Sequence, residues 1–130
     1  MVLIGGVAVP VEVAVTPAQR RQGLSDRESL APGAGMLFIF EAPMPLQFWM
    51  KGMHFPLDMV WIASDCTIGE ISQDIPPPPP DAADSEIARI SPSGNMQYVL
   101  EINGGEAASL GLGIGQPVEF AGSIAGRYGC

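Results

Sequence analysis

Short apolar segments separated by turn residues recur along this chain and predict short β-strands. VAVPVEVAV (7–15) alternates around a glutamate, and the proline within it indicates a sheet edge or a bulge. LDMVWIA (57–63) and TIGEISQ (67–73) flank Ser-Asp-Cys, a turn signal that predicts a hairpin. Further strands are predicted at MLFIF (36–40), which EAPMP then breaks, and at QFWMK (47–51), EIARI (86–90), MQYVLEING (96–104) and PVEF (117–120).

Helical signals are few and short. In TPAQRRQG (16–23) the threonine can cap a helix, the proline suits its first position, and the glutamine completes a capping box. Ser25 and Glu28 repeat the box for a single turn, and GEAASLG (105–111) predicts another short helix. The order of elements favours a mainly β fold, an antiparallel sandwich or partly closed barrel with one or two short helices.

Composition and charge narrow the function. A chain of 130 residues with 47% hydrophobic residues suits one domain, predicted over residues 1–121, with 122–130 as a loose C-terminal tail. The net charge of −8, with only six Lys and Arg residues, opposes binding to nucleic acid or to anionic lipid. No apolar run is long enough for a transmembrane helix, and the apolar start lacks the basic residues of a signal peptide. No cofactor is predicted.

Two further features leave alternatives open. Cys66 and Cys130 can form one disulfide, which would pin the C-terminal tail onto the hairpin, or can remain two free thiols. The run Pro76–Pro80, followed by DAAD, predicts a stiff polyproline-type loop. A rigid surface connection is favoured over a docking site for a partner that reads polyproline helices.

An ordered series of motifs resembles one family, domain of unknown function 192. The resemblance extends from about residue 7 to 120 and implies a single-domain, jelly-roll-like β fold, export to the periplasm or beyond in many bacterial members, and no established activity. Gly52 and Met53 stand where relatives usually have Asn-Thr, and Ser25 where they often have Met; Gly52 fits a family position that only makes a turn. The motifs are RRQGLSDRESL (20–30), GMLFIF (35–40), FWMKGMHFPLD (48–58), the proline run, YVLEINGG (98–105) and GLGIGQPVEF (111–120).

The candidate site rests on charged residues within apolar strands. Asp58 and Glu101 need partners there, because an isolated buried charge is costly, and Arg27 and Lys51 are the favoured partners of Asp58. Trp49 offers an aromatic face of the kind that stacks on a sugar ring. We therefore predict a non-catalytic module for a small polar ligand, such as a carbohydrate, or for a protein partner. An ion-pair network with a purely structural role competes with this interpretation.

Two alternative functions use overlapping residues. In a hydrolase, Asp58 and Glu101 would act as acid and base, which requires carboxylates about 5–10 Å apart across an open cleft. In a Cu(I)-handling protein, Met50, Met53 and His54 would supply soft ligands, against the ordinary role of methionine in cores. His54 is the only histidine and no GxSxG motif accompanies it, so the sequence gives little support to a catalytic triad. The sequence does not predict the oligomeric state.

Overall fold

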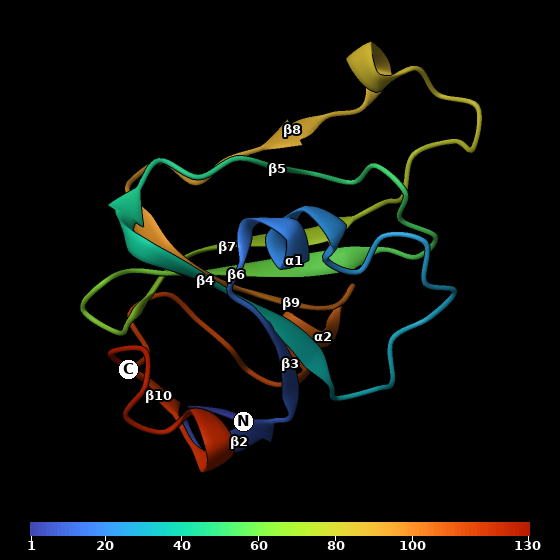
Figure 1. Ribbon diagram of the computed structural model, residues 1–130. Helices are drawn as coiled ribbons and strands as arrows, with labels where there is room; N and C mark the ends of the chain where they lie inside the picture. Colours follow the sequence, from blue (N-terminus) through green and yellow to red (C-terminus); the bar gives the residue numbers. More distant parts are fainter.

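The computed structural model describes all residues, 1–130, and is built on one five-stranded sheet. At one edge of the sheet the outer strand runs parallel to its neighbour, and all the other neighbouring strands are antiparallel. Figure 1 shows this sheet crossing the middle of the molecule. In spatial order the strands are β3 (Val11–Ala14), β4 (Gly35–Met44), β9 (Met96–Asn103), β6 (Leu57–Ile62) and β7 (Ile68–Ile75).

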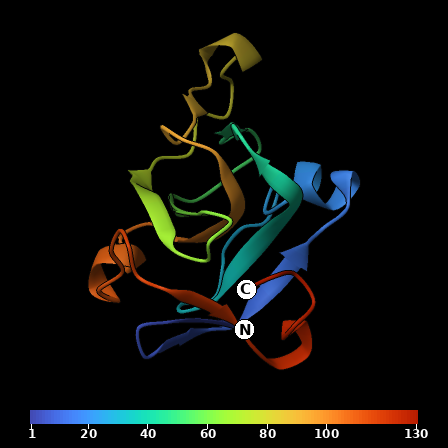
Figure 2. The same ribbon diagram turned by 90° about the vertical axis from the view of Figure 1, so that its left-hand side faces the viewer.

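Two small sheets and four short helical segments surround the central sheet. In Figures 1 and 2, the N- and C-terminal parts lie together at one end of the molecule, and the pair β5–β8 with η1 lies at the other end. The terminal sheet has the order β10 (Val118–Phe120), β1 (Val2–Ile4) and β2 (Val7–Val9), and the second pairs β5 (Phe48–Trp49) with β8 (Arg89–Ile90). The helical segments are α1 (Pro17–Gln22), α2 (Glu106–Ser109), η1 (Asp84–Glu86) and η2 (Gly122–Ile124).

Each face of the central sheet carries its own hydrophobic core. A cluster of 16 buried residues joins one face to the sheet β10-β1-β2 and to α2. A second cluster of 12 lies on the opposite face, with Leu24 after α1 and with Leu46, Met50 and Met53 from the segment that carries β5. All six residues of β6 are buried because this strand is covered on both faces. The fold is mainly β, sandwich-like and not a closed barrel, which confirms the predicted fold class.

The predicted local signals are confirmed in part. Pro10 separates β2 from β3, which join different sheets, and Thr16 and Gln19 form the expected capping box of α1. The helical turn predicted after Ser25 is wrong, since no helix forms there and Asp26 adopts a positive φ of 67°. The predicted break after MLFIF is also wrong, because β4 continues to Met44 with a shift of register.

The C-terminal segment is docked, contrary to the expected loose tail. Ile124 is buried in the larger core cluster, and the Tyr98 hydroxyl donates a hydrogen bond to the Tyr128 carbonyl. Cys66 and Cys130 form a disulfide with a Cα–Cα distance of 5.5 Å, so the alternative of two free thiols does not hold. Apolar burial, one hydrogen bond and one covalent bond therefore fix the segment.

The proline run Pro76–Pro80 connects β7 to the η1 region and lies outside every strand and helix. It follows the edge of the molecule in Figure 1. None of the helices has the length and apolar character needed to span a membrane.

Candidate functional site

A cavity of about 630 Å³ lies on the face of the central sheet that α1 covers. Its volume falls in the range of small-molecule sites. The walls come from α1 and the loop after it, from β4, and from the segment 47–53, and Glu101 of β9 also lines it. The side chains that line it include four aromatic residues and several charged ones: Phe38, Phe40, Phe48, Trp49, Arg20, Arg21, Asp26, Lys51 and Glu101.

Short-range chemistry positions the helix that forms one wall. Thr16 accepts a hydrogen bond from the Gln19 backbone, and the Gln19 side chain accepts from the Thr16 backbone, which fixes where α1 begins. Arg20 of α1 then anchors the helix to the sheet. Its guanidinium donates to the carbonyls of Val15 and Ile39 and lies 4.7 Å from the centre of the Phe40 ring.

Two loops that form the rim are tied to each other. The Ser25 hydroxyl donates to the Lys51 carbonyl at 3.0 Å, and the Asp26 backbone donates to the Gly52 carbonyl at 2.8 Å. Gly52 has a φ of +76°, a conformation that glycine adopts readily and asparagine tolerates. This supports a turn-forming role for the position, and Ser25 contributes directly to the rim.

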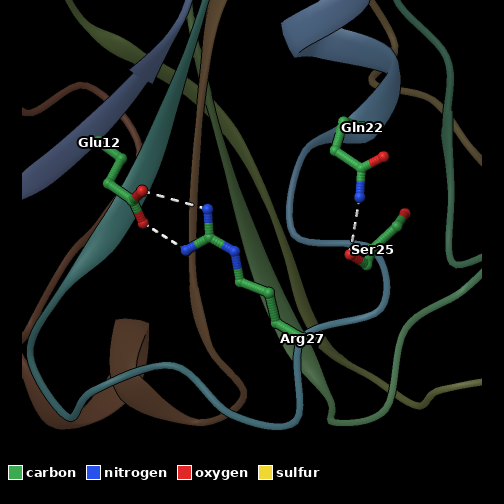
Figure 3. A network of polar contacts seen from close by, with 4 residues as sticks. All are labelled: Glu12, Gln22, Ser25 and Arg27. Atoms are coloured by element: carbon green, nitrogen blue, oxygen red, sulfur yellow. Dashed lines mark hydrogen bonds and ion pairs between the residues drawn. The ribbon is translucent and has the colours of Figure 1, made fainter.

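Figure 3 shows the polar contacts that hold the loop after α1. Arg27 forms a two-point ion pair with Glu12 of β3, and the Gln22 side chain donates to the Ser25 carbonyl at 3.0 Å. The hydrogen bond from Arg27 lowers the pKa of the Glu12 carboxyl, and Glu12 raises the pKa of the guanidinium. Arg27 therefore fixes the loop from outside and does not line the cavity.

Glu101 is the unusual group of this cavity. It is only 5% exposed, and Met36 and Met59 are its register partners on the neighbouring strands. Its carboxyl makes no ion pair and no hydrogen bond to another group of the protein. Burial without compensation raises the pKa of Glu101 to about 8, so the carboxyl is mostly protonated at pH 7.

Trp49 and Lys51 lie on the same cavity wall but already have partners. The Trp49 ring is contacted by two cations, with the Lys51 Nζ 5.2 Å and the Arg89 guanidinium 4.0 Å from its centre. Lys51 also forms an ion pair with Asp84 at 2.9 Å. Three of the five predicted site residues, Trp49, Lys51 and Glu101, thus share one cavity.

Asp58 lies elsewhere, and the prediction of its partners is wrong. It is fully buried, and its two oxygens accept hydrogen bonds from the backbone N–H groups of Asp74, Gly105 and Ala107 at 2.7–3.0 Å. Backbone amides at the start of α2, rather than Arg27 or Lys51, satisfy the carboxylate. Asp58 therefore joins β6, β7 and α2 and is not open to a ligand.

The geometry also overturns the predicted acid–base pair. Asp58 is opposite Ile102 in the sheet, whereas Glu101 is opposite Met59. Side chains of directly paired residues point to the same face, so Glu101 shares the face of Met59. Successive residues of a strand point to opposite faces, so Asp58, next to Met59, lies on the other face of the sheet. Asp58 is also sealed from solvent, so the two groups cannot flank a substrate.

The residues predicted as copper ligands differ in their exposure to solvent. Met50 and Met53 are 3% and 7% exposed and belong to the smaller core cluster, whereas His54 is exposed. The methionine side chains fill the core under the segment 47–53, which is an ordinary use of this flexible residue. The three residues do not form the predicted ligand set.

Sequence reasoning missed the part of the cavity formed by α1 and β4. Arg20 and Phe38 carry no chemical motif, and they were expected only as parts of a helix and a strand. One signal was available: RRQGL, GMLFIF and FWMKG, three of the family-like motifs, together contain most of the lining residues.

Comparisons with known proteins agree with the resemblance. The model of the family DUF192, described as "Uncharacterized ACR", matches residues 2–120. A Sinorhizobium meliloti protein of known structure, named as a "putative transcription regulator", is 42% identical, with a TM-score of 0.75. The match covers 84% of this chain and 79% of that protein. A protein of unknown function from Novosphingobium aromaticivorans is 33% identical, with a TM-score of 0.75; the match covers 85% of this chain and 74% of that protein. No curated protein matches the chain.

Proposed function

The chain belongs to the uncharacterised DUF192 family, and we propose that it is a ligand-binding module whose site is the cavity between α1 and the segment 47–53. One observation carries the proposal: the buried carboxyl of Glu101 lines this cavity without a partner. Buried polar groups in folded proteins are nearly always hydrogen-bonded, so an unpartnered one facing a cavity is suited to a ligand.

The lining supports binding rather than acid–base chemistry with two carboxyls. Asp58, the partner that a carboxylate pair would need, lies on the opposite face of the sheet. Trp49 and Lys51 provide an apolar surface and a charge at the cavity wall, and the ties between Ser25 and Lys51 hold that wall in place. A preformed site of this kind binds without a large cost in ordering.

The name of the Sinorhizobium relative raises a second possibility, regulation of transcription, but the charge of this chain opposes direct contact with DNA. The net charge is −8, and two of the six cationic side chains, Arg27 and Lys51, are paired with carboxylates. Proteins that bind the DNA backbone need clustered, available cations. We therefore favour binding of a small ligand over direct contact with DNA.

We propose further that the protein is exported. The Cys66–Cys130 disulfide supports this, because disulfides persist mainly in oxidising compartments. Thiol trapping of the protein in its native cells tests the proposal: an alkylating reagent would label neither cysteine after export, and would label both in a reducing cytoplasm.

Two tryptophans make the binding proposal testable by NMR. Trp49 lines the cavity, whereas the indole N–H of Trp61 donates to the Ser72 hydroxyl at 2.9 Å on β7. In a ¹H–¹⁵N spectrum, a compound that enters the cavity should shift the Trp49 indole signal and the amides of residues 20–26 more than the Trp61 signal. A Trp61→Phe variant assigns the two signals.

The screen should contain small sugars, carboxylic acids, amines and alcohols at millimolar concentration. Binding that maps to the cavity and weakens in Trp49→Ala supports the proposal. If no compound shifts these signals, or if every shift maps to another surface, the cavity is not the site.

A further inference from the structure

The charged groups around the cavity differ in whether they already have partners. Arg20 donates to two backbone carbonyls and stacks on Phe40, and Lys51 is paired with Asp84. These two cations are satisfied by the protein itself. An anionic ligand would have to compete with those existing contacts.

The remaining charges at the rim are balanced. Arg21 and Asp26 are exposed, line the cavity and belong to neither of the two ion pairs in the structure. Together these two side chains add no net charge to the lining. The chain as a whole is negative, with a net charge of −8, and so attracts cations rather than anions.

Glu101 is the group without compensation. Burial is the cause of its raised pKa, and neither ion pair of the structure includes it. A positively charged ligand group at the cavity floor would provide both the missing hydrogen bond and the missing counter-charge.

The aromatic walls indicate what the rest of the ligand should be. The rings of Phe40 and Trp49 are already contacted by Arg20, Lys51 and Arg89. Phe38 and Phe48, which pack edge to face with ring centres 5.0 Å apart, have no such cation. They offer apolar contact, so the ligand should combine its charge with an apolar body.

We infer that the cavity takes an organic amine, with its ammonium group bound to the Glu101 carboxylate and its apolar body against Phe38 and Phe48. This inference rests on the proposed binding function and names the ligand class of the same site.

Amine binding should release a proton. The protonated Glu101 carboxyl loses H⁺ to solvent and the resulting carboxylate pairs with the ammonium, so charge is conserved. Because the pKa of Glu101 is about 8, only about one molecule in ten is ionised at pH 7. As the pH increases, the affinity for the amine should therefore rise about tenfold per unit up to pH 8 and level off above pH 8.

Three probes of similar shape test the ligand class by isothermal titration calorimetry: 2-phenylethylamine, 2-phenylethanol and 3-phenylpropionate. Each is titrated at pH 6, 7 and 8, in two buffers with different ionisation enthalpies, so that proton release is measured directly. We expect the amine to bind most tightly and to release close to one proton at pH 7. Glu101→Gln should weaken amine binding at least tenfold at pH 8, and the same change at the exposed Glu119 should leave it unaltered.

The outcomes separate this inference from the proposed function. If the alcohol or the propionate binds as tightly as the amine, or if amine binding releases no proton, the inference is wrong while the cavity remains a binding site. If none of the probes binds and the broader NMR screen is also negative, both fail. If the amine binds equally well to Glu101→Gln, its ammonium group is not at Glu101.

Discussion

Replacing Glu101 by glutamine should stabilise the protein, and the gain should grow with pH. The folded state holds a carboxyl with a pKa of about 8, whereas the ordinary value is 4.5. Between these values the unfolded chain is ionised while the folded chain keeps its proton. Folding therefore takes up a proton at Glu101, and the contribution of this residue to the stability of the wild type falls as pH rises from about 4.5 to 8. Glutamine has a similar shape and does not ionise, so its variant escapes this loss.

The size of the effect follows from the two pKa values. Each pH unit in this interval is worth about 1.4 kcal/mol, because that is the free energy of a tenfold change in proton binding. Glu101→Gln should therefore exceed the wild type by about 1 kcal/mol at pH 5, about 3 kcal/mol at pH 7 and about 5 kcal/mol at pH 9. Glu101 is only 5% exposed, so solvent screening reduces these values little.

Urea unfolding at pH 5, 7 and 9, with the disulfide intact, measures the difference. Comparing variant and wild type at each pH removes the contribution of other groups, such as Glu12, whose lowered pKa acts in the opposite direction. Glu119→Gln, on the exposed side of β10, is the matched control and should differ little from the wild type at every pH. If the difference between Glu101→Gln and the wild type stays constant with pH, or if the wild type is the more stable of the two at pH 7, the pKa of Glu101 is not raised in the folded protein and the reasoning is wrong.

Two further stability predictions concern other parts of the fold. Asp58→Asn leaves at least one of three backbone N–H donors without an acceptor and should destabilise the protein by about 3 kcal/mol. If urea unfolding shows a loss of stability below about 1 kcal/mol, the assigned hydrogen bonds are contradicted. Replacing Cys66 and Cys130 together by serine opens a loop with a sequence separation of 64 and should reduce the free energy of unfolding by about 4 kcal/mol. The variant should therefore have a lower Tm than the oxidised wild type. An unchanged Tm would mean that the disulfide does not form in solution.

The strands were largely readable from the sequence because their signals are local. The apolar segments LDMVWIA (57–63) and TIGEISQ (67–73) and the turn between them are sufficient to predict β6 and β7, and the Thr16–Gln19 box is sufficient to place α1. The continuation of β4 through EAPMP was not readable. Its last residues are exposed, and Met44 pairs with Met96 of β9, a long-range contact that compensates for poor local propensity.

The docked C-terminal segment shows the same limit. Glycine-rich AGSIAGRYGC has no periodic pattern, and its order comes from partners distant in sequence: the disulfide to Cys66 and the hydrogen bond from Tyr98. Contacts of this kind depend on how the sheets pack. The cysteine count allowed the disulfide but could not decide between bonded and free thiols.

The two buried carboxylates show why only part of the site was predictable. The sequence correctly marked both Asp58 and Glu101 as acidic residues on apolar strands, but it does not say what covers each face. On one face the backbone amides of α2 reach Asp58; on the other, α1 and the segment 47–53 leave a cavity over Glu101. The same substitution, carboxylate to carboxamide, should therefore destabilise the protein at Asp58 and stabilise it at Glu101. Two losses of similar size would instead mean that both groups are structural, and the cavity would then lose the feature that marks it as a binding site.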